Sequence, residues 1–214
     1  MQRITELKRL ASPIPKPQSI VADGATLWVG SRETKQIVAI DVPTWQVKWE
    51  TMAPGVPYGM TLQNGELRVV CGETADDNRI IRRCVPYHGF DDAWGIACPD
   101  DTGSQLSWAD GTLYLSQWYP KKVIALAADG RPERTMSMPH EICGQVWVRG
   151  VLHLLTTDDE ETTDYWLTHV QMASDPVSTE DVAQIPFHAR ALAFDGRHFW
   201  TNHREQNEIV CFDV

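Results

Sequence analysis

The sequence has no run of lysine and arginine and no apolar segment near the length needed to cross a membrane. Nucleic acids and anionic membranes bind clustered positive charge, so neither is an expected partner. The balance is acidic instead, with 19 basic against 29 acidic residues and a formal net charge of −10. This acidity is typical of a soluble protein; a cationic ligand or a divalent metal ion is the alternative explanation.

The five cysteines contain no Cys-x-x-Cys pair, and their number is odd. The first twelve residues have no apolar core of the kind that marks a secretory signal. We therefore expect reduced, buried thiols and a cytoplasmic location. A secreted protein whose signal has been removed is the alternative.

Helical periodicity is nearly absent. Fourteen glycines and 13 prolines are spread along the 214 residues, together with nine tryptophans. This composition is typical of many short strands and turns, in a chain of the right length for one domain.

One phrase recurs along the chain. ADGATLWVGSRETKQIVAID, at residues 22–41, reappears as FDGRHFWTNHREQNEIVCFD at residues 194–213, with looser copies at 59–84, 105–127 and 144–170. Each copy is anchored by a glycine, and these recur at intervals of 39 to 46 residues: Gly24, Gly65, Gly111, Gly150 and Gly196. An internal repeat of this length indicates a modular fold.

Each unit has the pattern of antiparallel strands. An alternating apolar run ends in a tight-turn pair such as Asn-Gly, a second run follows, and a third comes after a variable polar loop. Most units add a weaker fourth run. Four strands every 40-odd residues predict an all-β, five-bladed β-propeller with four-stranded antiparallel blades. A β-sandwich is the rival, but it would not need this self-similarity.

The strand count also predicts how the ring closes. The fifth unit stops after its third run, and a spare segment precedes the first unit. We expect one domain, 1–214, with blades near 17–54, 57–99, 103–139, 142–187 and 190–214, the last completed by 1–16. Closure of this kind removes exposed strand edges. Ile4, Leu7 and Leu10 are spaced more like a helical turn, which leaves the register of this segment open.

The recurring phrase resembles the units of NHL, virginiamycin B lyase and gluconolactonase-like propellers. The resemblance covers nearly the whole chain, although five blades fit the five-bladed glutaminyl cyclases better. The lyase and gluconolactonase resemblance implies a divalent cation on the propeller axis. Here only Glu33, Glu73 and Glu141 stand in plausible places, without the full motif, and no catalytic residue is carried over. A fold alone does not decide function.

The loop face of the propeller is the expected site. The tight turns close one face, whereas the loops between second and third strands and the blade connections meet on the other. The reactive side chains expected there are Arg32, Glu33, Tyr58, Glu73, Trp118, His140, Glu141, His188, Arg190, His203 and Arg204. Polar residues are common at loop tips, so each could equally be solvated.

These residues suggest distinct roles. His140, His203 and His188 are candidate general acids or bases. Arg190 would clamp an anionic group, helped by Arg32 and Arg204, and Tyr58 and Trp118 would wall the ligand. The structural alternatives are that each histidine is only a hydrogen-bonded spacer and that Arg190 forms an ion pair with Glu141.

A metal site is a further hypothesis. Glu73 and Glu141, with His140, His188 and His203, would suit one divalent metal ion such as zinc, iron or nickel. The acidic run at 156–164 lacks the glycine and spacing of a calcium loop, so we expect a solvated hairpin tip. Cys71 and Cys143 are expected to be buried thiols; a nucleophile beside His140 is the alternative.

The sequence thus favours a small-molecule enzyme of the lyase, cyclase or hydrolase type, acting on an anionic ligand at the loop face, with or without a metal ion. A non-catalytic module that binds a ligand or a protein is the alternative, and a structural propeller is a third.

Overall fold

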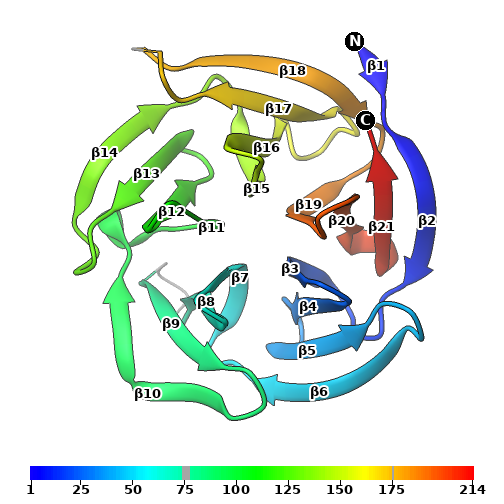
Figure 1. The fold of residues 1–214 in the computed structure, drawn as a ribbon, viewed down its shortest axis with the longest axis vertical. Helices are drawn as coiled ribbons and strands as arrows, with labels where there is room; N and C mark the ends of the chain where they lie inside the picture. The colour runs from blue at the N-terminus through cyan, green and yellow to red at the C-terminus, as the bar shows by residue number, and fades with distance from the viewer. Residues whose placement is uncertain (74–77, 175) are drawn as a thin grey trace.

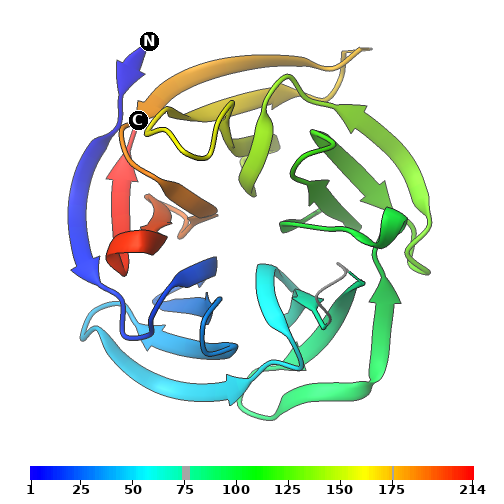
Figure 2. The ribbon, with the colours of Figure 1, turned by 180° about the vertical axis from the view of Figure 1, so that it is seen from behind.

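Five sheets surround a common axis in the computed structural model, which describes residues 1–73, 78–174 and 176–214 (Figures 1 and 2). Each has four antiparallel strands, and one of them gains a short fifth strand at its outer edge. Within each blade, consecutive strands pair antiparallel, and the first strand lies nearest the axis. The predicted all-β five-bladed propeller is therefore confirmed.

The blades contain the following strands, from the axis outward. Blade 1 has β3 (Pro17–Asp23), β4 (Thr26–Ser31), β5 (Gln36–Asp41) and β6 (Gln46–Met52). Blade 2 has β7 (Val56–Gln63), β8 (Glu66–Gly72), β9 (Arg79–Val85) and β10 (Gly89–Ala97). Blade 3 has β11 (Leu106–Ala109), β12 (Thr112–Gln117), β13 (Lys122–Leu126) and β14 (Pro132–Ser137). Blade 4 has β15 (Glu141–Val148), β16 (Val151–Thr157), β17 (Tyr165–Gln171) and β18 (Ser178–Ile185). Blade 5 has β19 (Ala189–Phe194), β20 (Phe199–His203), β21 (Glu208–Asp213) and β2 (Thr5–Ala11).

Helix is limited, in the described residues, to two short 3-10 turns, η1 (Pro99–Asp101) and η2 (Arg204–Gln206). Neither of these, nor any other described segment, offers a helix with the length and apolarity of a membrane span.

The N-terminal segment closes the ring, as predicted. β2 pairs antiparallel with β21 from Thr5 opposite Asp213 to Ala11 opposite Glu208. The short β1 (Gln2–Arg3) adds in parallel to β18 of the preceding blade. The N-terminus is thus bound to both neighbouring blades.

A bulge explains the helix-like spacing of the closing segment. Glu6 faces Phe212 and Lys8 faces Cys211, so Leu7 is the extra residue between them, and it is exposed. Ile4, just before β2, is buried with the apolar cluster between blades 4 and 5. The segment is a bulged strand rather than a helix.

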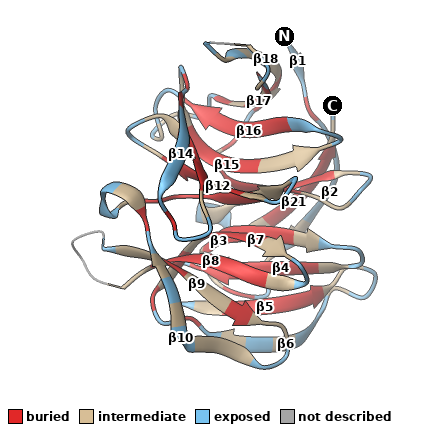
Figure 3. Cartoon of the chain, turned by 60° about the vertical axis from the view of Figure 1, so that its left-hand side comes forward, coloured by how far each residue is buried: buried red, intermediate tan, exposed pale blue. Residues whose placement is uncertain are grey.

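The core lies between adjacent blades. For example, Ile20 and Val29 of blade 1 pack with Ala193 and Trp200 of blade 5. Figure 3 shows inner strands largely buried and outer strands such as β6, β10 and β14 more exposed. All five cysteines are free and buried, as expected.

The predicted tight turns form at the ends of the first strands. Asn64 and Gly65 both have positive φ, 54° and 79°, which matches the turns that favour Asn-Gly pairs.

A histidine pair, with His153 buried and His169 half-buried, lies between blades 4 and 5. The rings of His153 and His169 are 4.3 Å apart, with Phe199 5.3 Å from His153. Burial lowers the pKa of His153 to about 4. The unfolded chain, with a pKa near 6.5, therefore binds more protons than the folded protein between these two values.

This difference in proton binding should make the free energy of unfolding depend on pH. Because the folded pKa is depressed, stability should fall as the pH falls from about 6.5 to about 4, by up to about 3 kcal/mol from His153. Urea unfolding at pH 7 and at pH 4.5 measures the loss. His153→Phe should lose distinctly less stability over this interval; an equal loss would show that His153 does not contribute.

Candidate functional site

A cavity of about 140 Å³ opens at the face where the first strands begin and the second strands end. Its lining comes from all five blades and consists of Gln18, Arg32, Tyr58, Arg79, Ser104, Gln105, Trp118, Tyr119, Glu160, Arg190 and Arg204. A second hollow of about 270 Å³ shares Arg32, Glu160, Arg190 and Arg204 with the first and also includes Glu161, His188 and Glu205. We refer to both together as the axial mouth.

Bulges in the innermost strands shape this mouth. The pairing of β3 with β4 skips Gln18, and the pairing of β7 with β8 skips Tyr58. The skipped residues both line the cavity. Bulges redirect side chains near the ends of strands, so these two residues face the mouth because the ladder is interrupted.

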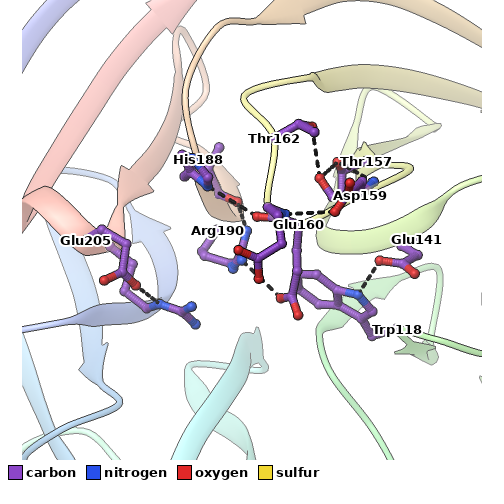
Figure 4. Close-up of polar contacts among 12 residues, drawn as sticks. Trp118, Glu141, Thr157, Asp159, Glu160, Thr162, His188, Arg190 and Glu205 are labelled. Atoms are coloured by element: carbon purple, nitrogen blue, oxygen red, sulfur yellow. Dashed lines mark hydrogen bonds and ion pairs between the residues drawn. The ribbon is translucent and has the colours of Figure 1, made fainter.

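Arg190 is the most deeply buried charge of the mouth, with only 5% of its side chain exposed. Its Nη1 donates to the Tyr165 hydroxyl and, at 3.0 Å, to the Ala189 carbonyl. Its Nη2 lies 3.3 Å from a Glu160 carboxylate oxygen, whereas Nε has no partner in the described residues. The guanidinium also lies 4.8 Å from the centre of the Trp118 ring, which fixes its plane (Figure 4).

Two more arginines extend the positive charge. Arg204 donates to Gln18 Oε1 at 2.8 Å and to Glu205 at 3.1 Å. Burial, followed by the nearby charge of Arg190, lowers the pKa of the Arg204 guanidinium. Arg32 is exposed and makes no side-chain hydrogen bond or ion pair with the described residues. The mouth is therefore cationic on an acidic protein.

The other side of the cavity is aromatic. The Arg79 guanidinium stacks 3.8 Å from the centre of the Tyr58 ring, and its Nη1 donates to the Gly103 carbonyl. Trp118 donates from Nε1 to Glu141 at 2.7 Å. Rings held in this way can wall an apolar part of a ligand.

Glu160 is a lining residue that the sequence analysis did not identify. It lies within the acidic run expected to be a solvated tip, yet its backbone carbonyl accepts from His188 Nδ1 at 3.2 Å and from the Tyr165 hydroxyl at 3.3 Å. These contacts turn its carboxylate toward Arg190 (Figure 4). The sequence analysis also missed five other lining residues: Gln18, Arg79, Ser104, Gln105 and Tyr119. Only for Glu160 did the sequence offer a signal, the acidic run that contains it.

The structure brings together six of the expected residues: Arg190, Arg204, Arg32, Tyr58, Trp118 and His188. His140 lies outside this lining, because it packs 5.1 Å from Trp166 and its Nδ1 lies 2.7 Å from Asp158. His203 lies outside it too: its ring stacks on Phe187 with 5.5 Å between centres. Burial lowers the pKa of His203, which favours the neutral ring.

The expected metal ligands are not assembled. No group of three or more His, Cys, Asp or Glu residues among those described could hold a metal ion. Glu73 is 2.6 Å from Arg82, and Glu141 accepts the Trp118 hydrogen bond. With His140 and His203 also directed elsewhere, the donors do not fit a resident cation. Glu33 lies beside Lys16 and Arg204 at the edge of the mouth.

Neither candidate thiol is activated. Burial raises the pKa of Cys71 to about 12 and raises that of Cys143 as well. A thiolate is the nucleophilic form, so both behave as the buried thiols expected from the sequence.

Comparison with solved structures supports the fold. No family model matches the sequence, and no curated protein sequence matches it. Glutaminyl cyclase from Myxococcus xanthus is similar with a TM-score of 0.77 at 10% identity, over 99% of this chain and 96% of that one. The PQQ-bound aldose sugar dehydrogenase of Streptomyces coelicolor gives 0.66 at 12% identity, over 98% and 97%.

Virginiamycin B lyase from Staphylococcus aureus, in an inactive form with quinupristin, gives a TM-score of 0.57 at 14% identity, over 92% of this chain and 67% of that one. The expected resemblance to propellers of this kind is therefore confirmed for the fold. At these identities the shared fold does not transfer an activity.

Proposed function

We propose that the chain is a small-molecule enzyme that binds an anionic substrate in the axial mouth. The observation that carries this proposal is the meeting of Arg32, Arg190 and Arg204 in both hollows of the mouth, beside Arg79 in the first and the carboxylates Glu160, Glu161 and Glu205 in the second. Guanidinium groups pair with carboxylates and phosphates through two parallel hydrogen bonds. A partly enclosed site strengthens such charge pairing relative to water.

His188 is the residue proposed to exchange a proton with the substrate. The Glu160 carbonyl can only accept, so the Nδ1 that faces it carries a hydrogen. In the neutral ring Nε2 is then the free basic nitrogen, and the side chain lines the same hollow as the arginines. Proton transfer to or from a clamped anion is the common element of lyase, cyclase and hydrolase steps.

Anion binding can be tested at Arg32, because its removal leaves no described partner group without a contact. Arg32→Gln should weaken the binding of succinate about tenfold in calorimetry, while the melting temperature hardly moves. Lys35→Gln removes one positive charge from the same loop without touching the mouth and should change the affinity less than twofold. Equal effects of both variants would mean that the arginine makes no specific contact.

Catalysis can be separated from binding with His188→Gln. A panel of dicarboxylates and phosphate esters incubated with the protein should show turnover of at least one compound by mass spectrometry. His188→Gln should abolish that turnover and retain affinity. Binding without turnover by the unmodified protein would favour the non-catalytic ligand-binding module instead.

A further inference from the structure

Glu160 occupies the position at Arg190 that a ligand would need. Its carboxylate meets Nη2 of Arg190 at 3.3 Å and is 39% exposed, so it is a long and partly solvated ion pair. The neighbouring Nε lies on the same edge of the guanidinium and has no described partner. One carboxylate oxygen thus engages half of an edge that can hold two.

We propose that Glu160 is an internal stand-in for the substrate's anionic group and that the mouth selects small dianions, such as dicarboxylates and phosphate esters. This inference rests on the proposed function. A ligand with a single carboxylate that replaced Glu160 would exchange one arginine–carboxylate pair for another. A second negative charge, placed on Arg204 and Arg32, adds pairing that Glu160 does not supply.

The contacts around Glu160 would allow a ligand to replace its carboxylate at Arg190. The base of the loop is held independently of the carboxylate: Thr157 Oγ1 donates to the carbonyls of Asp159 at 3.0 Å and Asp164 at 2.8 Å. The backbone of Glu160 is anchored by His188 and Tyr165. The carboxylate can therefore leave Arg190 while the loop keeps its base.

Two neighbouring arginines can take a second anionic group. The described hydrogen bonds of the Arg204 guanidinium go to Gln18 and Glu205. The Glu205 carboxylate also forms an ion pair with Lys16, at 2.8 Å. Arg32 has no described partner, although it shares both hollows with Arg190. A dianion that spans these guanidinium groups would meet more unpaired charge than a monoanion of equal length.

The test compares succinate with butyrate, which have the same number of carbons. Calorimetry on the full chain should give a Kd for succinate at least tenfold below that for butyrate. Glu160→Gln should tighten butyrate binding at least fivefold and narrow the preference. Asp164→Asn is the matched control: it removes one negative charge from the same loop, at a carboxylate outside the lining of the mouth with no described ion pair, and should change each Kd less than threefold.

A second measurement follows the loop. Hydrogen exchange of residues 157–164 should not become slower when succinate binds to the unmodified protein, because the Glu160 carboxylate gives up its contact with Arg190 while the loop keeps its own backbone contacts. Slower exchange there, weaker binding in Glu160→Gln, or equal effects of Glu160→Gln and Asp164→Asn would each overturn the stand-in role. If neither anion binds to the unmodified protein or to Glu160→Gln, the proposed function itself fails.

Discussion

Deletion of Met1–Ala11 should leave the protein aggregated or melting at least about 10 °C lower. The deletion removes β2 and β1, exposes the full edge of β21, and takes Ile4 out of the core between blades 4 and 5. Burial of one such side chain contributes about 1.5–3 kcal/mol. In a protein of this size each kcal/mol corresponds to about 2–4 °C, and the lost strand pairing adds to the effect.

A shorter deletion is the control. Removal of Met1–Arg3 takes away β1 but leaves β2 on β21, so the melting temperature should fall much less. Differential scanning calorimetry with size-exclusion chromatography compares the three proteins. If the longer deletion stays monomeric and melts like the full chain, ring closure through β2 does not stabilise the fold.

Gly144→Ala should cost about 3 kcal/mol or more and lower the melting temperature by about 6–12 °C. A Cβ at this position on β15 would lie 2.6 Å from backbone atoms of both Ala191 and Leu192 on β19. Those atoms belong to the innermost strand of the next blade, so no flexible side chain can move away. The five inner strands approach the axis closely enough to require glycine here.

Gly24→Ala is the matched control for Gly144→Ala. Its Cβ would meet nothing within 4 Å, although its φ of 56° makes a side chain unfavourable. That conformation costs roughly 1–2 kcal/mol, and the variant should be clearly the milder of the two in thermal unfolding. A reversed order would mean that β15 and β19 are not in close backbone contact.

The repeat made the fold readable from sequence. The number of blades follows from counting five glycine-anchored units. The closure of the ring follows from the additional strand that precedes the first unit. Neither prediction needs the directions of side chains. Leu7 shows the limit of this reading. Its spacing from Ile4 and Leu10 looked helical because a bulge inserts one residue, and a bulge leaves no periodic signal.

The sequence predicted only part of the site, because bulges in the strand pairing and contacts within loops set the directions of its side chains. Gln18 and Tyr58 face the mouth at bulges. Glu160 is turned inward by contacts from Tyr165, five residues away, and from His188, 28 residues away. His140 was expected in the mouth from its place in a blade connection. It is held instead by Asp158, 18 residues away, which the order of residues does not reveal.

The most direct test of the account is a crystal structure of the full chain grown with succinate. We predict one carboxylate within about 3.2 Å of Nη2 of Arg190 and the other at the same distance from Arg204 or Arg32. Succinate bound outside the axial mouth, or a mouth without succinate at concentrations that saturate binding in solution, would contradict the central claim that these arginines form an anion site.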